Sequence, residues 1–176
     1  GVIERIRHRA PRNPDGDLKN ATVGARAITT RTLPDPPSAD LLEDGMDLTE
    51  PSDILVLAQA GIRALVDDDG GHVLAPVIEQ VRVLKPDVVD PHYLAVMLRG
   101  SWNARFLVGT TIQRAKLTDL EVPLVPMEDQ KRLVAALAEV ARFRNAAQSI
   151  TEASETLSSS LMDAVRFNIN LDTTTT

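Results

Sequence analysis

The sequence predicts an α+β protein, in which a globular domain of short strands and one helix is followed by a very long C-terminal helix. Three stretches support this prediction. The run SDILVLAQAG at 52–61 is almost continuously apolar and of strand length, as in a buried strand. DPHYLAVMLRG at 90–100 carries the start and stop signals of a helix. From residue 128 onward, apolar residues recur at steps of three and four over about 40 residues, which is a helical period.

The first 50 residues are divided by the turn signals PRNPDGD, LPDPPS and EDGMD. Short strands are expected between these turns, one of them over 21–30. Beyond the buried strand at 52–61, a second strand is expected to run to a turn at DDDGG (67–71), and a third strand over 77–84. LEVPLVP at 120–126 alternates like a strand, and its prolines suit an edge or a terminus.

The helix at 90–100 has a recognisable beginning and end. Asp90 can cap it, Pro91 suits its first position and Gly100 ends it. Its apolar face is expected to consist of Leu94, Met97 and Leu98.

The long C-terminal helix is expected over 127–171, with Glu128 and Asp129 at its favourable N-terminal end. Some 40 residues of helix at 1.5 Å each would be about 60 Å long, and a helix of this length with a narrow apolar seam generally pairs with another helix. The apolar spacing slips by about one residue in the middle, as at a stammer. The alternative is two shorter helices packed on their own domain. The seam expected to pair comprises Leu133, Leu137, Val140, Ala147, Ile150, Leu157 and Leu161.

Composition excludes several classes of protein. The chain has no Cys and only three isolated His, which argues against disulfides and structural zinc, and no cofactor is expected. No apolar run approaches the roughly 18 residues of a membrane span, so a cytoplasmic protein is expected. The first residue is Gly rather than Met, which suggests a trimmed tag or a piece of a longer protein.

Charge is distributed unevenly along the chain. The net charge of −6 arises mainly from residues 35–70, which hold ten acids and one Arg, whereas residues 1–34 hold seven bases and three acids. The basic groups can therefore still converge on one face and bind nucleic acid, although dispersed surface charge is the alternative.

No motif supports an enzyme. DPPS at 35–38 resembles the tetrad of adenine N6-methyltransferases, but Ser38 replaces the aromatic residue that stacks on a flipped base. Asp67–Asp69 lack the alternating spacing of a calcium loop and are expected to form a solvated hairpin tip. Ser158–Ser160 have no base near them in the sequence, and the histidines are too scattered to suggest a triad.

GTTIQRAKLTDLEVPLVPMEDQKRL at 109–133 resembles the end of a target recognition domain from the specificity subunits of type I restriction-modification systems. The sequence departs from the family pattern at Val125, Met127 and Asp129. The residues that match are Gly109, Thr110, Thr111, Ile112, Leu117, Leu120, Pro123, Pro126, Gln130 and Leu133.

Three further segments resemble the same family, namely SDILVLAQAG, DPHYLAVMLRG and SLMDAVRFNINL. The first 50 residues are less well covered. RHRAPRNPDGD, VGARAIT and VDDDGGHVLAP are more similar to the recognition domains fused to the C-terminus of N6-adenine DNA methylases, which is a second parent context.

The resemblance implies a DNA recognition domain over 1–126 with a twisted, largely antiparallel sheet, a helix over 127–171 and a disordered tail over 172–176. In the family, one such domain reads about half of a split DNA site. The helix serves as a coiled-coil spacer that docks N6-adenine methyltransferase subunits, and a restriction subunit can join them. With one domain and one helix, this chain would dimerise through the helix or belong to a longer protein. It would itself be no enzyme.

Short polar and cationic side chains suit the reading of base edges and the binding of phosphates. The alternative is that each is an ordinary solvated loop residue. A different function, a protein-interaction adaptor that binds no DNA, draws its support from the acidic block over 35–69. The residues expected to bind double-stranded DNA are Gln59, Gly61, Arg63, Asn103, Arg105, Gly109, Thr110, Thr111, Gln113, Arg114 and Lys116.

Overall fold

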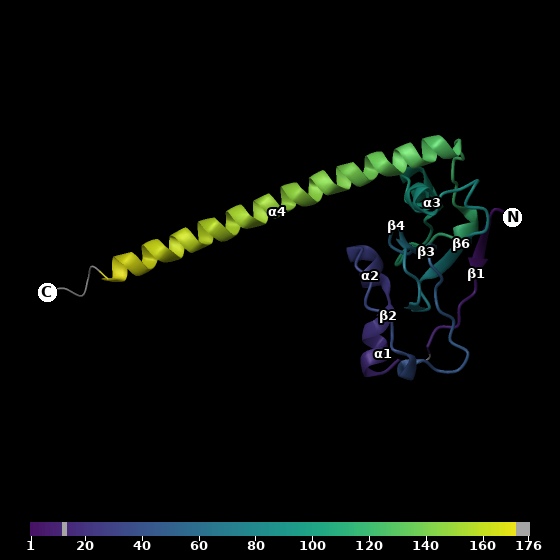
Figure 1. Cartoon of the computed structure of the whole chain (residues 1–176), viewed down its shortest axis with the longest axis horizontal. Coiled ribbons are helices and arrows are strands. Elements are labelled where there is room, and N and C mark those ends of the chain that lie inside the picture. Colours follow the sequence, from purple (N-terminus) through teal and green to yellow (C-terminus); the bar gives the residue numbers. More distant parts are fainter. Residues whose placement is uncertain (12–13, 172–176) are drawn as a thin grey trace. The chain divides into compact units, whose positions relative to one another are not determined.

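The structure, a computed structural model, describes residues 1–11 and 14–171, with side chains described as far as residue 166 (Figure 1). It divides into two compact units, Gly1–Val134 and Ala135–Thr176, so that the boundary falls inside the long C-terminal helix. The tail expected over 172–176 lies outside the described residues.

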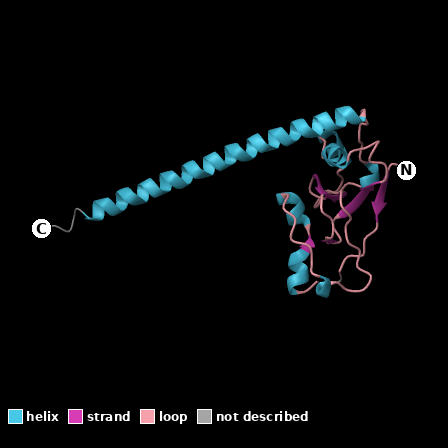
Figure 2. Ribbon diagram, viewed as in Figure 1, coloured by secondary structure: helices cyan, strands magenta, loops and turns pink. Residues whose placement is uncertain are grey.

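The first unit is built on a four-stranded antiparallel sheet in the order β1-β6-β3-β4. A pair of two-residue strands, β2 and β5, forms a separate parallel ladder. Figure 2 shows that loops make up much of this unit. The predicted α+β class is confirmed, as are the strands expected at 52–61, after residue 61 and at 77–84. The strands are β1 (Ile3–Ile6), β2 (Thr22–Val23), β3 (Asp53–Ala58), β4 (Ile62–Asp67), β5 (Val73–Leu74) and β6 (Glu79–Val83).

Strand β3 is apolar along its length because both of its faces are buried. Ile54, Val56 and Ala58 belong to one core cluster, together with residues of helix α3 (Pro91–Leu98). Leu55 and Leu57 belong to a second cluster on the opposite face, together with residues of β2 and of helix α2 (Ala25–Thr30).

The strand predicted over 21–30 is wrong. Helix α1 (Gly16–Ala21), strand β2 and helix α2 occupy this part of the chain, and a 3-10 helix η1 (Ala39–Leu41) follows. The hydroxyl groups of Thr29 and Thr30 donate to the carbonyls of Ala25 and Arg26, four residues earlier. These threonines therefore support a helical turn despite their strand propensity.

The strand predicted over 120–126 is also wrong, although its alternation is real. After the 3-10 helix η3 (Leu117–Asp119), Leu120 and Val122 pack against the core while Glu121 is exposed. Side chains, not a neighbouring strand, bind the backbone of this segment. Trp102 Nε1 donates to the carbonyl of Glu121 at 3.0 Å, and Tyr93 Oη donates to that of Pro123 at 2.5 Å.

Helix α3 follows its predicted signals closely. The Asp90 side chain accepts a hydrogen bond from the Tyr93 amide at 2.9 Å, and Pro91 is the first helical residue. Leu94, Met97 and Leu98 are buried, as predicted. A 3-10 helix η2 (Ser101–Phe106) begins directly after Gly100.

Helix α4 (Met127–Leu171) is a single helix of 45 residues, so the alternative of two shorter helices is excluded. Its predicted seam residues are all exposed to solvent. Phe143, Met162 and Val165 are further exposed apolar side chains on this helix. No helix in the described part of the chain is long and apolar enough to cross a membrane.

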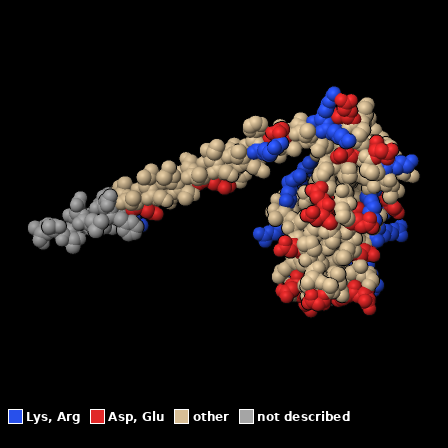
Figure 3. All heavy atoms as spheres, viewed as in Figure 1, with Lys and Arg blue, Asp and Glu red and all other residues tan. Residues whose placement is uncertain are grey.

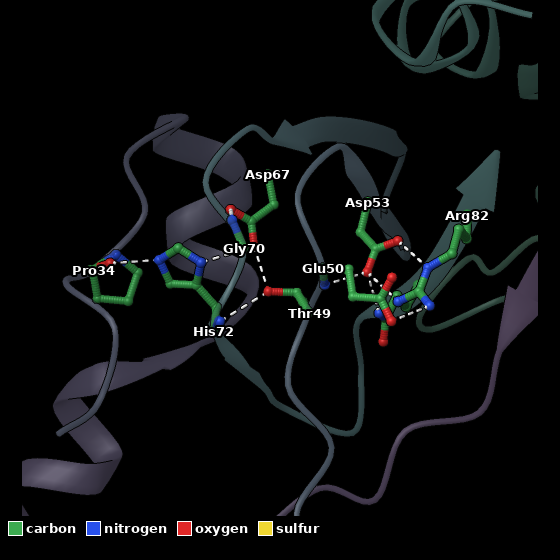
Figure 4. Close-up of polar contacts among 9 residues, drawn as sticks. Pro34, Thr49, Glu50, Asp53, Asp67, Gly70, His72 and Arg82 are labelled. Carbon is green, nitrogen blue, oxygen red and sulfur yellow. Dashed lines mark hydrogen bonds and ion pairs between the residues drawn. The ribbon is translucent and has the colours of Figure 1, made fainter. Parts of the chain in front are cut away.

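A buried polar cluster fixes the start of β3 (Figure 4). Asp53 accepts hydrogen bonds from Arg82, from the Glu50 amide and from Gln80. Burial acts to raise the pKa of Asp53, but these hydrogen bonds outweigh it and hold the pKa below the ordinary 3.8. The same ion pair raises the pKa of the Arg82 guanidinium.

A second buried cluster fixes the end of β4, where Asp67 lies opposite Asp53 in the ladder. Asp67 accepts hydrogen bonds from Thr49 Oγ1 at 2.5 Å and from the Gly70 amide at 3.0 Å, and its Oδ2 lies 2.8 Å from His72 Nδ1. The expected solvated tip is therefore wrong for Asp67, because its carboxylate orders the turn, whereas Asp68 and Asp69 are exposed. Both clusters stabilise the end of the β3–β4 hairpin that lies away from its connecting turn.

Candidate nucleic-acid interface

The turn between β3 and β4 lies against the loop that precedes η3. The Ala60 amide donates to the carbonyl of Gln113 at 2.9 Å, and the Ala115 amide donates to that of Ala58 at 3.1 Å. Gln59 and Arg114 form an isolated antiparallel bridge. The structure thus brings together two groups of predicted residues that are about 50 positions apart in the sequence.

The loop itself is closed at its base. Val108 and Arg114 exchange two backbone hydrogen bonds of 2.9 Å, and residues 109–113 lie between them. Gly109 has a φ of +128°, and a Cβ at this position would lie 2.6 Å from the Ile112 carbonyl oxygen, so only glycine fits. We call residues 108–114 the recognition loop. The side chains of Thr110, Thr111 and Gln113 are exposed on it.

The turn opposite the loop is equally constrained. Ala60 and Gly61 have φ values of +52° and +117°, so two consecutive residues adopt left-handed backbone conformations. The Arg63 guanidinium lies 3.7 Å from the point at which a Gly61 Cβ would project. The positive φ, rather than a lack of space, therefore favours glycine at position 61.

Some cations of the first unit are engaged by acidic side chains, and those at this surface are not. Arg5 and Arg82 are paired with Glu79 and Asp53. Within the described part of the chain, Arg63, Arg114 and Lys116 form no ion pair. Their positive charges are therefore available to an external anion.

Asn103 is a correction to the predicted DNA-contact set. Its side chain has no solvent exposure and is fully used inside the protein. Its Nδ2 donates to the carbonyls of Met97, Leu98 and Glu121, and its Oδ1 accepts from the Glu121 amide at 2.8 Å. Asn103 therefore positions the end of α3 and the 120–126 segment. Nothing in the sequence around Asn103 indicates that its side chain is buried rather than exposed.

Arg105 lies on the surface but is engaged by its neighbours. Its guanidinium forms an ion pair with Glu121 and lies 4.8 Å from the centre of the Phe106 ring. It is thus less available for DNA than Arg63 or Arg114.

Two arginines that the sequence did not single out lie near each other at the ends of helices. Burial lowers the pKa of the Arg99 guanidinium, and the nearby charge of Arg31 lowers it further. Arg31 ends α2 with a φ of +59°, a conformation that usually falls to glycine or asparagine. Because 21–30 was predicted as a strand, the position of Arg31 at a helix end could not be foreseen.

Figure 3 shows how charge is distributed on one face of the first unit. Acidic side chains gather at the end formed by α1 and the neighbouring loop, at the bottom of this view. Lys and Arg lie mainly away from that end. The negative net charge therefore does not exclude an anionic partner at the basic part of the surface.

The arrangement is suited to binding. The exposed groups are hydroxyls, an amide and cations on a rigid loop, which can donate hydrogen bonds to base edges and to phosphates. Among the residues that the structure describes, no group of three His, Asp or Glu could hold a metal ion.

No protein-family model and no curated protein matches the sequence. Several solved structures are similar to it, including the following two. One comes from a study of complex assembly and conformational transition of the type I restriction-modification system. Its sequence is 20% identical to this chain, the TM-score is 0.57, and the match covers 87% of this chain and 40% of that chain. The other is the S subunit of a type I restriction-modification system from M. genitalium, with 18% identity, a TM-score of 0.42, and coverage of 53% of this chain and 27% of that chain.

The second similarity is too loose to carry an argument, and the first establishes the fold alone. This chain spans less than half the length of either protein. The family resemblance in the sequence is confirmed at the level of the fold: the chain has the antiparallel α+β architecture with a long C-terminal helix of a type I restriction-modification system component.

Proposed function

We propose that this chain recognises a specific DNA sequence as a specificity subunit, or half-subunit, of a type I restriction-modification system, and so directs N6-adenine methylation and restriction. The observation that supports this most is the pairing of the recognition loop with the β3–β4 turn. It joins Gln59, Gly61 and Arg63 to the polar and cationic residues of 109–116 in one surface. Catalysis would reside in partner subunits or in a fused domain.

The chemistry of this surface fits a duplex groove. Gln113 can form two hydrogen bonds with adenine, and Arg114 can do so with guanine. The hydroxyls of Thr110 and Thr111 can either donate or accept. Lys116 follows Arg114 by two positions and Arg63 follows Gly61 by two, so both can bind flanking phosphates, which fix the register without reading sequence. Asn103 is no longer part of this proposal.

Helix α4 would be the assembly arm. Its seam from Leu133 to Leu161 is exposed throughout, and such a seam is stabilised when a second helix covers it. The second helix would come from another copy of this chain or from a longer parent, and an N6-adenine methyltransferase subunit would dock on the pair. A restriction subunit could join the same assembly. The recognition domain over 1–126 and the arm over 127–171 would then act as separate parts.

The alternative, a protein-interaction adaptor without DNA binding, is weakened by the structure of the acidic block. Asp53 and Asp67 are buried and bound by groups of the same chain, so they present no charge to a partner. Many of the exposed acids lie at the end of the first unit formed by α1 and the neighbouring loop, and others are interspersed with Lys and Arg.

The test is selection from random duplexes by the chain alone and together with its modification subunit, followed by mobility-shift measurements at several salt concentrations. We expect an enriched sequence and an affinity that falls as salt rises. The double variant R114A/K116A should bind more weakly, whereas K19A, an exposed cation on α1, should bind like the wild type. Absence of both an enriched sequence and salt-dependent binding would support the adaptor.

A further inference from the structure

The recognition loop displays apolar side chains as well as polar ones. Val108 is 71% exposed, more than any other large apolar residue of the first unit, and Ile112 is 48% exposed. They flank Gly109, Thr110 and Thr111 in the sequence. Aliphatic side chains do not bind phosphate, so phosphate contacts alone do not explain why these two side chains are exposed here.

These side chains do not contribute to the core. Leu107 packs against the core cluster that contains Ala58 and Val81, and Ala115 belongs to that cluster. The chain therefore leaves the interior at Val108 and returns to it at Ala115. Between these points, backbone hydrogen bonds close the loop without help from the apolar side chains.

The loop conformation keeps Ile112 in place. Gly109 lies so close to the Ile112 carbonyl that a Cβ at residue 109 would be 2.6 Å from its oxygen, and the two backbone hydrogen bonds between Val108 and Arg114 close the loop around both residues. The Gln113 carbonyl is then bound by the Ala60 amide. An exposed apolar group on a backbone held from both sides is available to a ligand at little entropic cost.

The surroundings indicate the chemistry of that ligand. Exposed hydroxyls, an amide and cations surround the apolar groups, from Thr110 to Lys116. In the major groove of DNA, thymine is the base that presents an apolar group, its C5-methyl, next to a hydrogen-bond acceptor. A loop that combines an aliphatic tip with hydrogen-bond donors matches this pattern.

We infer that Ile112, supported by Val108, contacts the C5-methyl group of a thymine in the major groove and thereby determines part of the sequence specificity. This inference rests on the proposed DNA recognition. Removal of the aliphatic side chain, or of the methyl group it contacts, removes the same apolar contact.

The experiment uses the full chain and a duplex obtained by selection from random sequences. Each thymine is replaced in turn by deoxyuridine, which lacks only the methyl group and leaves base pairing unchanged. We expect one replacement to weaken binding about fourfold, equivalent to about 0.8 kcal/mol for one buried methyl group. The other replacements should have little effect.

Variants connect the methyl group to the loop. I112A should bind the thymine duplex more weakly and should no longer distinguish it from the deoxyuridine duplex. V77A, which truncates an exposed apolar residue before β6, should keep the wild-type ratio. Ile112 is half-exposed, so I112A should fold. Thermal unfolding followed by circular dichroism checks that each variant is folded.

The outcomes separate this inference from the proposed function. Sequence-selective binding with no thymine sensitive to methyl removal would overturn the inference and leave DNA recognition standing. The same holds if I112A weakens both duplexes equally, because the side chain would then act without reading a methyl group. Absence of DNA binding by the wild-type chain would overturn both.

Discussion

Arg82 on β6 binds Asp53 on β3 at two points: Nε lies 2.8 Å from Oδ1 and Nη2 lies 2.8 Å from Oδ2. Arg82 Nη1 also donates to Glu50 Oε1 at 2.6 Å. Because Asp53 begins the central strand and has no solvent exposure, this pair fixes how β3 enters the sheet.

The ion pair should make the fold sensitive to acid. The pKa of Asp53 is lowered in the folded protein, so the stability it confers is present above about pH 4 and is lost as pH falls through the folded pKa. At pH 7, D53N should lower the free energy of unfolding by about 3 kcal/mol, because it removes the buried carboxylate that Arg82 binds at two points and leaves only the exposed Glu50 as its counter-charge. Urea unfolding at pH 7 and pH 3 measures both effects.

The difference between wild type and D53N should shrink at pH 3, because below pH 3.8 the Asp53 carboxyl of the unfolded wild type gains its proton while that of the folded protein still resists protonation. D69N changes an exposed carboxylate and should alter the free energy of unfolding at pH 7 by no more than about 0.5 kcal/mol. A D53N penalty that stays constant between the two pH values would contradict the assignment.

Gln130 should be the most sensitive polar residue at the start of α4. Its side chain is fully buried, accepts from the Asp90 amide at 2.9 Å, and donates to the carbonyls of Val88 and Val125. Q130A leaves three backbone groups without these partners, so we expect a loss of about 2–3 kcal/mol in the free energy of unfolding. Q148A, on an exposed part of the same helix, is the matched control and should unfold like the wild type.

Replacing Arg31 by glycine should stabilise the fold and, if the Arg31 charge attracts DNA, weaken DNA binding. Glycine adopts the left-handed conformation without the steric cost that arginine bears, so R31G should stabilise the protein by about 1 kcal/mol. Thermal unfolding measures this gain. If the charges of Arg31 and Arg99 attract DNA, R31G should at the same time weaken binding and flatten its salt dependence. Unchanged DNA affinity would show that the Arg31 charge does not contribute to binding.

The elements that can be predicted from the sequence are those whose local signals agree with their environment in the fold. The Asp90–Pro91 start of α3 and the continuous apolar run of β3 need no knowledge of the rest of the chain. The 45-residue length of α4 likewise follows from a periodic pattern.

Prediction from the sequence failed where distant residues decide the outcome. The alternation at 120–126 is that of a strand, yet Asn103, Trp102 and Tyr93 take the backbone groups that a neighbouring strand would have used. Asp67 was expected in solvent because three acids precede two glycines, but Thr49 and His72 reach it from elsewhere in the sequence. The pairing of Gln59 with Arg114 likewise depends on tertiary contacts.

The seam of α4 should mediate self-association. Leu157 is 61% exposed and lies in the middle of the distal part of the seam. In sedimentation experiments over a range of concentrations, we expect the wild type to form dimers and L157E to remain monomeric, because a charge inside a helix pair is costly. S159E places the same charge about 200° around the helix and should still dimerise. A wild-type chain that stays monomeric would require the second helix to come from another protein.

Arg114 and Lys116 should contribute to DNA binding in different ways. The Arg114 backbone is fixed by two hydrogen bonds to Val108, so its guanidinium projects from a rigid base and can contact guanine at two points. R114A should cost about 1–3 kcal/mol on the selected sequence and relax the preference at one position. K116A should weaken binding to all sequences alike and reduce the salt slope by about 0.9, as for one lost phosphate contact. Measuring both variants against a panel of single-base substitutions distinguishes the roles, and an R114A loss that is uniform across the panel would make Arg114 a phosphate contact instead.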